Sequence, residues 1–151
     1  MHWFVRFLAV AFLLILWPFN GFAKIHQIQM LNSKNKQSMI FDPDFLEIDV
    51  GDEVEFVPID KGHNSQAIFV PRDAERWHGK NDQKIRVKFT RDGIYVFECK
   101  NHAIMGMIGA VRVGEVDDQD DELKKFLLNY QKKLAINKNR IDNLLKKLSV
   151  E

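Results

Sequence analysis

Apolar and polar residues alternate with a period of two through most of residues 25–113. The alternation is clearest at 46–50, where apolar side chains flank acidic ones, and at 85–89, where they flank basic ones. A period of two places alternate side chains on opposite faces of a strand, whereas a helix would need a period near 3.6. The pattern therefore predicts half-buried β-strands and excludes a helical bundle for this part of the chain.

Further short strands are predicted between turns that are rich in Gly, Pro and Asp. The expected strands cover residues 25–32, 46–50, 53–57, 85–89, 94–99 and 107–113, and the turns lie at 42–44, 50–52, 61–62 and 91–93. Many short strands separated by turn residues favour an all-β fold, an antiparallel two-sheet sandwich with Greek-key connections. The least regular stretch is 64–82, in which we expect a short helix around 73–77.

The pattern changes after Gly114, where helical spacing replaces alternation. Two apolar sets repeat at helical intervals, namely Leu123, Phe126, Leu127, Tyr130 and Leu134, and then Ile141, Leu144, Leu145 and Leu148. We expect a C-terminal two-helix extension at residues 115–151, with a break near 137–139, packed on the sandwich. A partner-docking or membrane-surface helix is the alternative, although the balanced charges of this segment give little attraction to an anionic membrane.

The N-terminal residues 1–23 have a different composition. Arg6 precedes an unbroken apolar run at 7–17, and the small residues Gly21 and Ala23 follow it. This arrangement is typical of a secretory signal peptide that is cleaved after Ala23, because a membrane-spanning helix needs about 20 apolar residues. An uncleaved anchor is the alternative.

The chain has 22 basic and 21 acidic residues, a formal net charge of +1. This balance excludes a nucleic-acid-binding function that depends on a strongly basic chain. It also indicates that the protein does not stay attached to a membrane once the signal peptide is cleaved. Partner choice therefore has to come from local patches.

The single cysteine, Cys99, has no partner for a disulfide within the chain. His102 and Met107 follow Cys99 on one predicted loop, and His63 follows an upstream turn that an adjacent strand can bring to the same end of the sandwich. Two imidazoles, a thiolate and a thioether match the His₂Cys set with a weak axial Met that holds blue copper. Zinc is the competing metal, because Cys and His suit it equally well.

Each of these residues also has an ordinary interpretation. Alone, His63 and His102 would be loop residues, Cys99 a small buried hydrophobe and Met107 a core residue. A nucleophilic pair of Cys99 and His102 is a further possibility, in which His63 and Met107 would be incidental. The conjunction of all four favours the metal site. The other histidines of the mature chain, His26 and His78, are interpreted as structural or exposed.

Two segments resemble a known family. Residues 60–64, with the sequence DKGHN, and residues 99–107, with the sequence CKNHAIMGM, are similar to the copper-binding segments of the pseudoazurins, which are small cupredoxins. The similarity extends to residues 30–32, 39–41 and 56–58 and to the two-helix tail.

The resemblance implies a cupredoxin-like Greek-key β-sandwich at residues 24–114 and one type 1 copper ion bound by His63, Cys99, His102 and Met107. It places Met39 and Met105 near the exposed edge of His102. It further implies a monomeric periplasmic electron carrier, not an enzyme. Its partners would be a donor such as a c-type cytochrome and an acceptor such as a copper nitrite reductase, docking near His102. An apolar patch there, with Lys61 and Lys100 as steering charges, would receive them.

A copper chaperone or storage protein remains the alternative function. Such a protein should carry exposed clusters of exchangeable Met or His, but the five methionines form no tract. A multicopper enzyme would need further ligands, and the chain has no His-x-His motif.

Two asparagines lie next to the expected ligands. Asn64 follows His63, and we expect its side chain to tie the two ligand loops together and its backbone N–H to reach the Cys99 sulfur. Asn101 stands where the pseudoazurins usually have proline. Its backbone N–H, which proline would lack, is expected to favour Cu(I).

Overall fold

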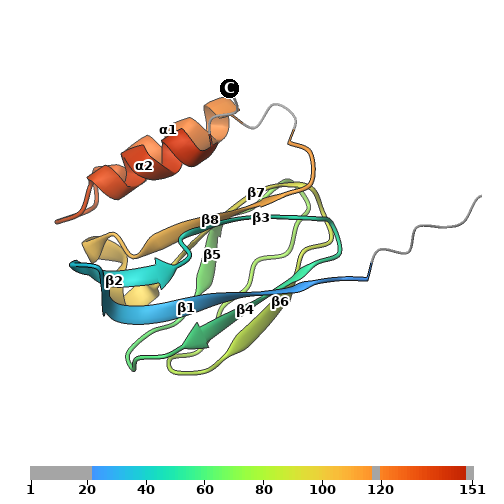
Figure 1. Ribbon diagram of the computed structural model, residues 1–151. Coiled ribbons are helices and arrows are strands. Elements are labelled where there is room, and N and C mark those ends of the chain that lie inside the picture. Colours follow the sequence, from blue (N-terminus) through green and yellow to red (C-terminus); the bar gives the residue numbers. More distant parts are fainter. Residues whose placement is uncertain (1–21, 117–119, 149–151) are drawn as a thin grey trace, which may run out of the picture.

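The computed structural model describes residues 22–116 and 120–148. Two four-stranded sheets pack face to face, and two helices cover the outer face of one of them (Figure 1). The first sheet contains β2 (Gln37–Asp42), β1 (Ile25–Lys34), β4 (Glu53–Pro58) and β6 (Ile85–Lys88), in that order. The second contains β3 (Phe45–Ile48), β8 (Ile108–Val113), β7 (Gly93–Glu98) and β5 (Gln66–Phe69). The predicted all-β sandwich with a two-helix extension is confirmed.

The predicted antiparallel pairing was wrong for two pairs of strands. β1 pairs with β4 in parallel, and β3 pairs with β8 in parallel, whereas the other pairs are antiparallel. The parallel pairs arise because the chain passes from one sheet to the other at every step from β2 to β7, so that strands distant in sequence become neighbours. A single strand's alternation carries no information about the direction of its partner.

The expected helix around residues 73–77 was wrong. This segment is irregular, and its Trp77 side chain lies in the core between the sheets, stacked on Phe56 with ring centroids 5.6 Å apart. The Trp77 carbonyl accepts a hydrogen bond from the Ala67 N–H at 3.0 Å, and its indole N–H donates to Ser65 Oγ at 3.0 Å. These contacts anchor the segment as an extended connection beside β5. The strands β2 and β5 were themselves not predicted.

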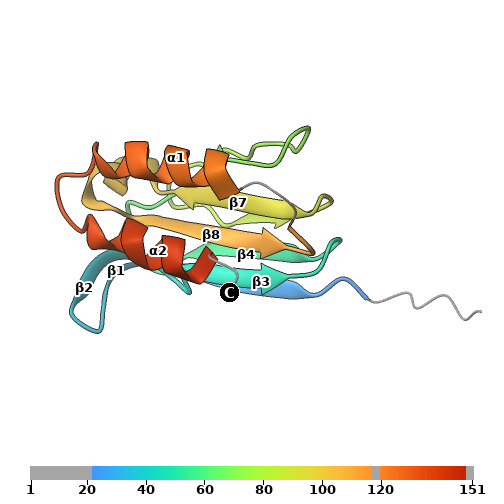
Figure 2. The same cartoon turned by 90° about the horizontal axis from the view of Figure 1, so that it is seen from above.

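The helices α1 (Asp120–Gln131) and α2 (Asn139–Leu148) lie side by side over β7 and β8 (Figure 2). Their buried side chains form one apolar cluster with Phe69, Ile94, Val96, Ile108 and Ala110 of the sheet. Strand β7 is therefore buried on both faces, which explains its nearly continuous apolar sequence. Leu134 belongs to this cluster but lies in the turn between the helices, because α1 ends earlier than its apolar spacing indicated.

One buried polar contact joins the helices to the strand that precedes the cysteine. The Tyr130 hydroxyl of α1 donates to the Glu98 carboxylate at 2.6 Å, and Gln66 Nε2 donates to the same carboxylate at 2.7 Å. Burial and the nearby Glu98 carboxylate raise the pKa of Tyr130, so the phenol stays protonated and can donate. Glu98 is therefore satisfied although it is only 8% exposed.

Among the residues that the structure describes, every helix is too short or too polar to cross a bilayer. The expected signal peptide lies outside the described residues, except for Phe22 and Ala23.

Truncating Leu127 should reduce the stability of the fold. Its side chain is fully buried between α1 and the sheet, so Leu127→Ala is expected to lower the free energy of unfolding by about 2–5 kcal/mol. Leu128→Ala is the matched control, because Leu128 is 40% exposed on the same helix. Urea unfolding of both variants measures the difference, and equal losses would contradict the packing described here.

Candidate metal centre

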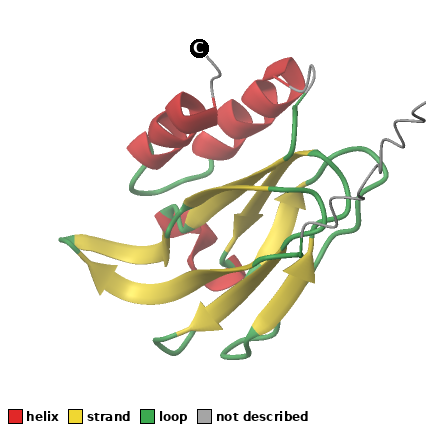
Figure 3. Cartoon of the chain, turned by 45° about the vertical axis from the view of Figure 1, so that its right-hand side comes forward, coloured by secondary structure: helices red, strands yellow, loops and turns green. Residues whose placement is uncertain are grey.

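The four expected donor residues lie in two loops at one end of the sandwich. Cys99 directly follows β7, His102 lies in a 3₁₀ segment, η1 (Lys100–Met105), and Met107 directly precedes β8. His63 lies in the loop between β4 and β5. Figure 3 shows η1 apart from the paired tail helices. The antiparallel pairing of β7 with β8 brings Cys99 and Met107 together, and the Cys99 N–H donates to the Met107 carbonyl at 3.0 Å.

Three of the donors converge on one point. Cys99 Sγ lies 3.4 Å from His102 Nδ1 and 3.9 Å from His63 Nδ1, and the three atoms lie within 4.8 Å of one another. Metal–nitrogen and metal–sulfur bonds of about 2.0 and 2.3 Å that meet at about 110–120° separate donor atoms by about 3.5–3.7 Å. The observed sulfur–nitrogen separations lie on either side of this value. The three donors are therefore close enough to be brought onto a single metal ion by small movements of the side chains.

The His63 ring is oriented by a residue on β1. His63 Nε2 lies 2.9 Å from Asn32 Oδ1, which can only accept, so Nε2 carries the proton and Nδ1 presents its lone pair to the cysteine. Burial lowers the pKa of His63, and the neighbouring His102 lowers it further. The neutral imidazole is the form that binds a metal, so both effects prepare His63 as a ligand.

The loop from Cys99 to Met107 has its own hydrogen bonds. The His102 N–H donates to the Cys99 carbonyl at 3.0 Å, and the Met107 N–H donates to the His102 carbonyl at 3.3 Å. Gly106 ends η1 with φ at 76°, a left-handed conformation that glycine adopts readily, and its N–H donates to Ala103. This turn reverses the chain, so that Met107 enters β8.

Asparagine side chains connect the two ligand loops. Asn64 Oδ1 accepts a hydrogen bond from the Lys100 N–H at 2.8 Å, which confirms the predicted tie through its side chain. Asn101 Nδ2 donates to the Gly62 carbonyl at 2.8 Å and to Asn81 Oδ1 at 3.1 Å, and Asn64 Nδ2 donates to the same Asn81 oxygen at 3.0 Å. The loops that carry His63 and His102 are thus linked next to both histidines. Donation of the Asn101 or Asn64 backbone N–H to the sulfur stays a prediction.

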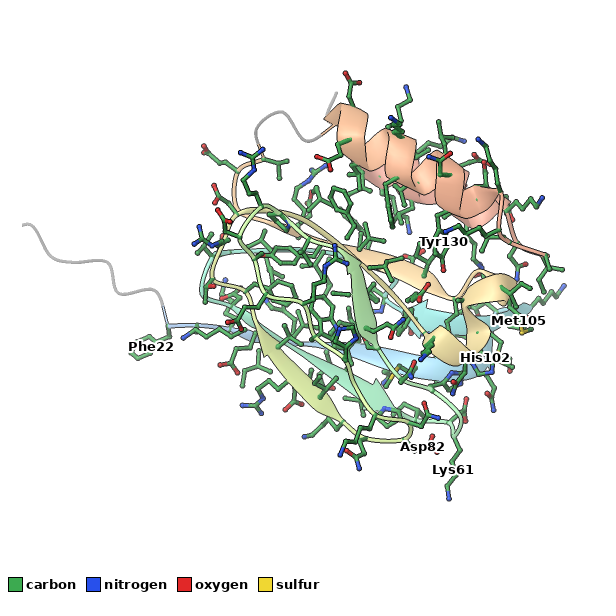
Figure 4. All side chains as sticks on the ribbon, turned by 180° about the vertical axis from the view of Figure 1, so that it is seen from behind. Phe22, Lys61, Asp82, His102, Met105 and Tyr130 are labelled. Carbon is green, nitrogen blue, oxygen red and sulfur yellow. The ribbon has the colours of Figure 1, made fainter. Side chains whose placement is uncertain are left out.

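The centre is closed to water except at one histidine. His63, Cys99 and Met107 are fully buried, whereas His102 is half-buried. Figure 4 shows His102, Met105, Lys61 and Asp82 at one end of the molecule and Phe22 at the other. The N-terminal end of the described chain is therefore remote from the centre.

The other two described histidines lie outside the cluster. His26 Nε2 lies 2.8 Å from the buried Asp52 carboxylate, and His78 is exposed beside β5. Both agree with the structural or exposed roles expected from the sequence.

Sequence reasoning did not identify several residues that support the centre. Asn32 and Asn81 contact it from positions distant in the chain, and so do groups from the turn between the tail helices. Each is an ordinary turn or strand-end residue in the sequence, and only its long-range partner reveals its role.

A family model described as copper binding proteins of the plastocyanin/azurin family matches residues 28–114. Among curated proteins, the chain is 37% identical to pseudoazurin from Paracoccus pantotrophus over 106 residues, which cover 69% of this chain and 73% of that protein. It is 36% identical to pseudoazurin from Methylorubrum extorquens over 104 residues, which cover 68% of this chain and 70% of that protein.

Solved structures agree with these sequence matches. The fold resembles the crystal structure of pseudoazurin from Methylobacterium extorquens AM1 with a TM-score of 0.68 and 32% identity, covering 83% of this chain and 99% of that one. It resembles pseudoazurin from Hyphomicrobium denitrificans with a TM-score of 0.67 and 27% identity, covering 83% and 99% of the two chains.

Removing the partner of His63 should weaken metal binding. Asn32→Ala leaves Nε2 of His63 without its acceptor and frees the ring to change tautomer, so affinity is expected to fall about 10- to 100-fold. Chelator competition with Zn(II) on the metal-free protein measures this change. Asn129→Ala, an exposed substitution on α1, should leave the affinity unchanged, and an equal affinity in the Asn32→Ala protein would show that the hydrogen bond does not orient the ligand.

Proposed function

Because the chain belongs to the plastocyanin/azurin family of copper-binding proteins and is a pseudoazurin homologue, we propose that it is a periplasmic type 1 blue-copper protein that carries single electrons. Its donor would be a respiratory protein such as a c-type cytochrome, and its acceptor a terminal reductase such as a copper nitrite reductase. The observation that carries the proposal is the convergence of His63 Nδ1, Cys99 Sγ and His102 Nδ1 at one end of the fold.

We assign His63, Cys99, His102 and Met107 as the residues that hold the ion. Bound copper supplies a one-electron Cu(I)/Cu(II) couple. Imidazole nitrogens suit both oxidation states, and thiolate and thioether sulfur favour the softer Cu(I), so the set tolerates either state. Four protein donors leave no place for a substrate, and the family consists of non-enzymatic electron carriers, so the function is transfer and not catalysis.

His102 provides the exit for the electron, because it is the one member of the converging donor set that reaches the surface. Exposed apolar side chains lie beside it, with Ile104 at 59% and Ile136 at 46% exposure. The Ala135 N–H donates to the Ile104 carbonyl at 2.9 Å, which brings the tail turn to this surface. A small apolar surface suits a transient redox encounter, and the exposed Lys61 and Lys100 at its edge would steer an acidic partner.

The burial of the donors supports a carrier over a chaperone or storage protein. A protein that hands on the ion itself needs exposed and exchangeable ligands, whereas His63 and Cys99 are both fully buried here. A closed centre retains its metal and passes only the electron.

The proposed leader, residues 1–23, supports a periplasmic location. Phe22 is 96% exposed next to the proposed cleavage site after Ala23 and lies at the end of the molecule remote from His102. Cleavage there would leave a monomer with a cupredoxin domain at 24–114 and a helical extension at 115–151, held together by the apolar cluster beneath the helices.

The visible spectrum of residues 24–151 after addition of Cu(II) tests the proposed function directly. We expect an intense thiolate-to-copper charge-transfer band that is bleached by reductant and abolished by Cys99→Ser. His78→Ala is the control for adventitious copper on a surface histidine and should keep the band. A pale wild-type spectrum with tight Zn(II) or Cu(I) binding would overturn the carrier function and favour a structural metal or a chaperone.

Replacing Asn101 should change the reduction potential. Asn101→Pro removes the backbone N–H that we expect to withdraw electron density from the Cys99 sulfur, so its potential should be lower than that of the unmodified protein. Asn101→Ala is the matched control, because it removes the side-chain bonds to Gly62 and Asn81 but keeps the N–H. Its potential should stay closer to the unmodified value. Voltammetry measures all three, and equal potentials for the unmodified and proline proteins would refute the hypothesis.

A further inference from the structure

The two-helix tail donates hydrogen bonds to three successive backbone carbonyls of the loop between Cys99 and Met107, the ligand loop. The donors come from the turn between α1 and α2 and from the first turn of α2: Ala135 N–H to Ile104 O at 2.9 Å, Asn137 Nδ2 to Met105 O at 2.8 Å, and Arg140 Nη1 to Gly106 O at 3.0 Å. The accepting residues are three of the four that lie between His102 and Met107. The tail therefore holds this part of the loop along its length.

Arg140 also connects the loop to the first sheet. Its guanidinium donates to the Met39 carbonyl at 2.8 Å and to the Ser38 carbonyl at 2.7 Å, in addition to Gly106. Met39 and Ser38 belong to β2, so one half-buried cation joins a strand, a helix and the ligand loop. Hydrogen bonds from a charged donor are stronger than those between neutral groups, which suits Arg140 to this role.

The tail lies against the loop at Gly106, where the nearest tail residue is Asn137. A methyl group added at Gly106 would lie 3.3 Å from Asn137 Cβ and 3.3 Å from the Asn137 carbonyl oxygen. Asn137 itself has φ at 55°, in the left-handed region that asparagine tolerates better than most residues. This conformation aims its side chain at the Met105 carbonyl.

Apolar packing does not hold the η1 segment. None of its six residues, all of them within the described chain, is buried. A short 3₁₀ segment also has poor internal hydrogen-bond geometry. Its position therefore depends on bonds to residues outside the segment: those to Asn64, Gly62 and Asn81 at its start and those to the tail at its end. His102 lies between these two supports.

We propose that Asn137 and Arg140 are positioning residues, a tail clamp that fixes the loop between His102 and Met107 and so keeps both donors in place. The proposal rests on the proposed function for its consequence in the copper-loaded protein. With the loop held, His102 and Met107 need not move when an electron arrives or leaves, and the loop cannot open to release the ion. The C-terminal extension is then a part of the metal centre as well as a cover for the sheet.

The first test follows amide hydrogen exchange in the metal-free protein, where copper cannot hold the loop. The two variants are Arg140→Met, which keeps an unbranched apolar side chain but has no donors, and Asn137→Gly, which tolerates the left-handed backbone. Each should speed exchange of the Gly106 and Met107 N–H groups about tenfold, since each loses hydrogen bonds that hold the loop closed.

Arg112→Met is the matched control. Arg112 also anchors the tail, because its guanidinium donates to the Leu148 carbonyl at 2.6 Å, but at the end of α2 away from the loop. This variant should loosen the end of α2 and leave exchange at Gly106 and Met107 unchanged. Unchanged loop exchange in both clamp variants would overturn the proposal, as would equal acceleration by Arg112→Met, which would reduce the clamp to a general effect on stability.

The second test uses the copper-loaded protein and a Cu(II) chelator. Release of the ion should be about tenfold faster from Arg140→Met than from the wild type, with a shift in the relative intensities of the charge-transfer bands, whereas Arg112→Met should match the wild type. Identical release and spectra in all three proteins would overturn the clamp. A wild-type protein without the band would refute the proposed function instead, and the exchange measurement would still decide the clamp.

Discussion

The pairing of β7 with β8 is the constraint on which the rest of the centre depends. It sets Cys99 at the end of one strand and Met107 at the start of the next, joined by the bond from the Cys99 N–H to the Met107 carbonyl. The loop between them is short, so His102 has little freedom in where it can lie. Because β7 is buried on both faces, by the sandwich core and by the tail helices, this pairing is well shielded from water.

The second ligand loop is brought to this hairpin by connections between sheets. The chain leaves β4 in one sheet and enters β5 in the other, and His63 lies in that crossing. Hydrogen bonds of asparagine side chains then link the loop between β4 and β5 to the loop between β7 and β8. Asn32 of β1 orients the ring of His63. Neutral amides suit this position, because they satisfy backbone groups without adding charge beside the buried Cys99.

Elements whose own sequence pattern reflects their burial were predicted correctly, whereas elements defined by partners distant in the chain were not. Alternating strands such as 53–57 and 94–99 were located correctly, because their pattern reflects burial on one or both faces. Strands β2 and β5 have weaker patterns and are defined mainly by their partners. The segment 73–77 was predicted to be helical from its local sequence. Burial of the Trp77 side chain in the core stabilises the fold more than a single isolated helical turn would. Leu134 likewise keeps its burial without belonging to a helix.

The sequence by itself determined the sandwich class, the two tail helices and the identity of the soft donors, because periodicity and residue chemistry are local properties. Only the tertiary structure decided how these parts act together: the approach of His63 to Cys99, the parallel strand pairs, the Asn81 link between the loops and the bonds from Asn137 and Arg140 to the ligand loop. Each of these contacts joins residues that are far apart in the chain. No local pattern specifies such a partner, since the partner is fixed only when the sheets and helices have packed.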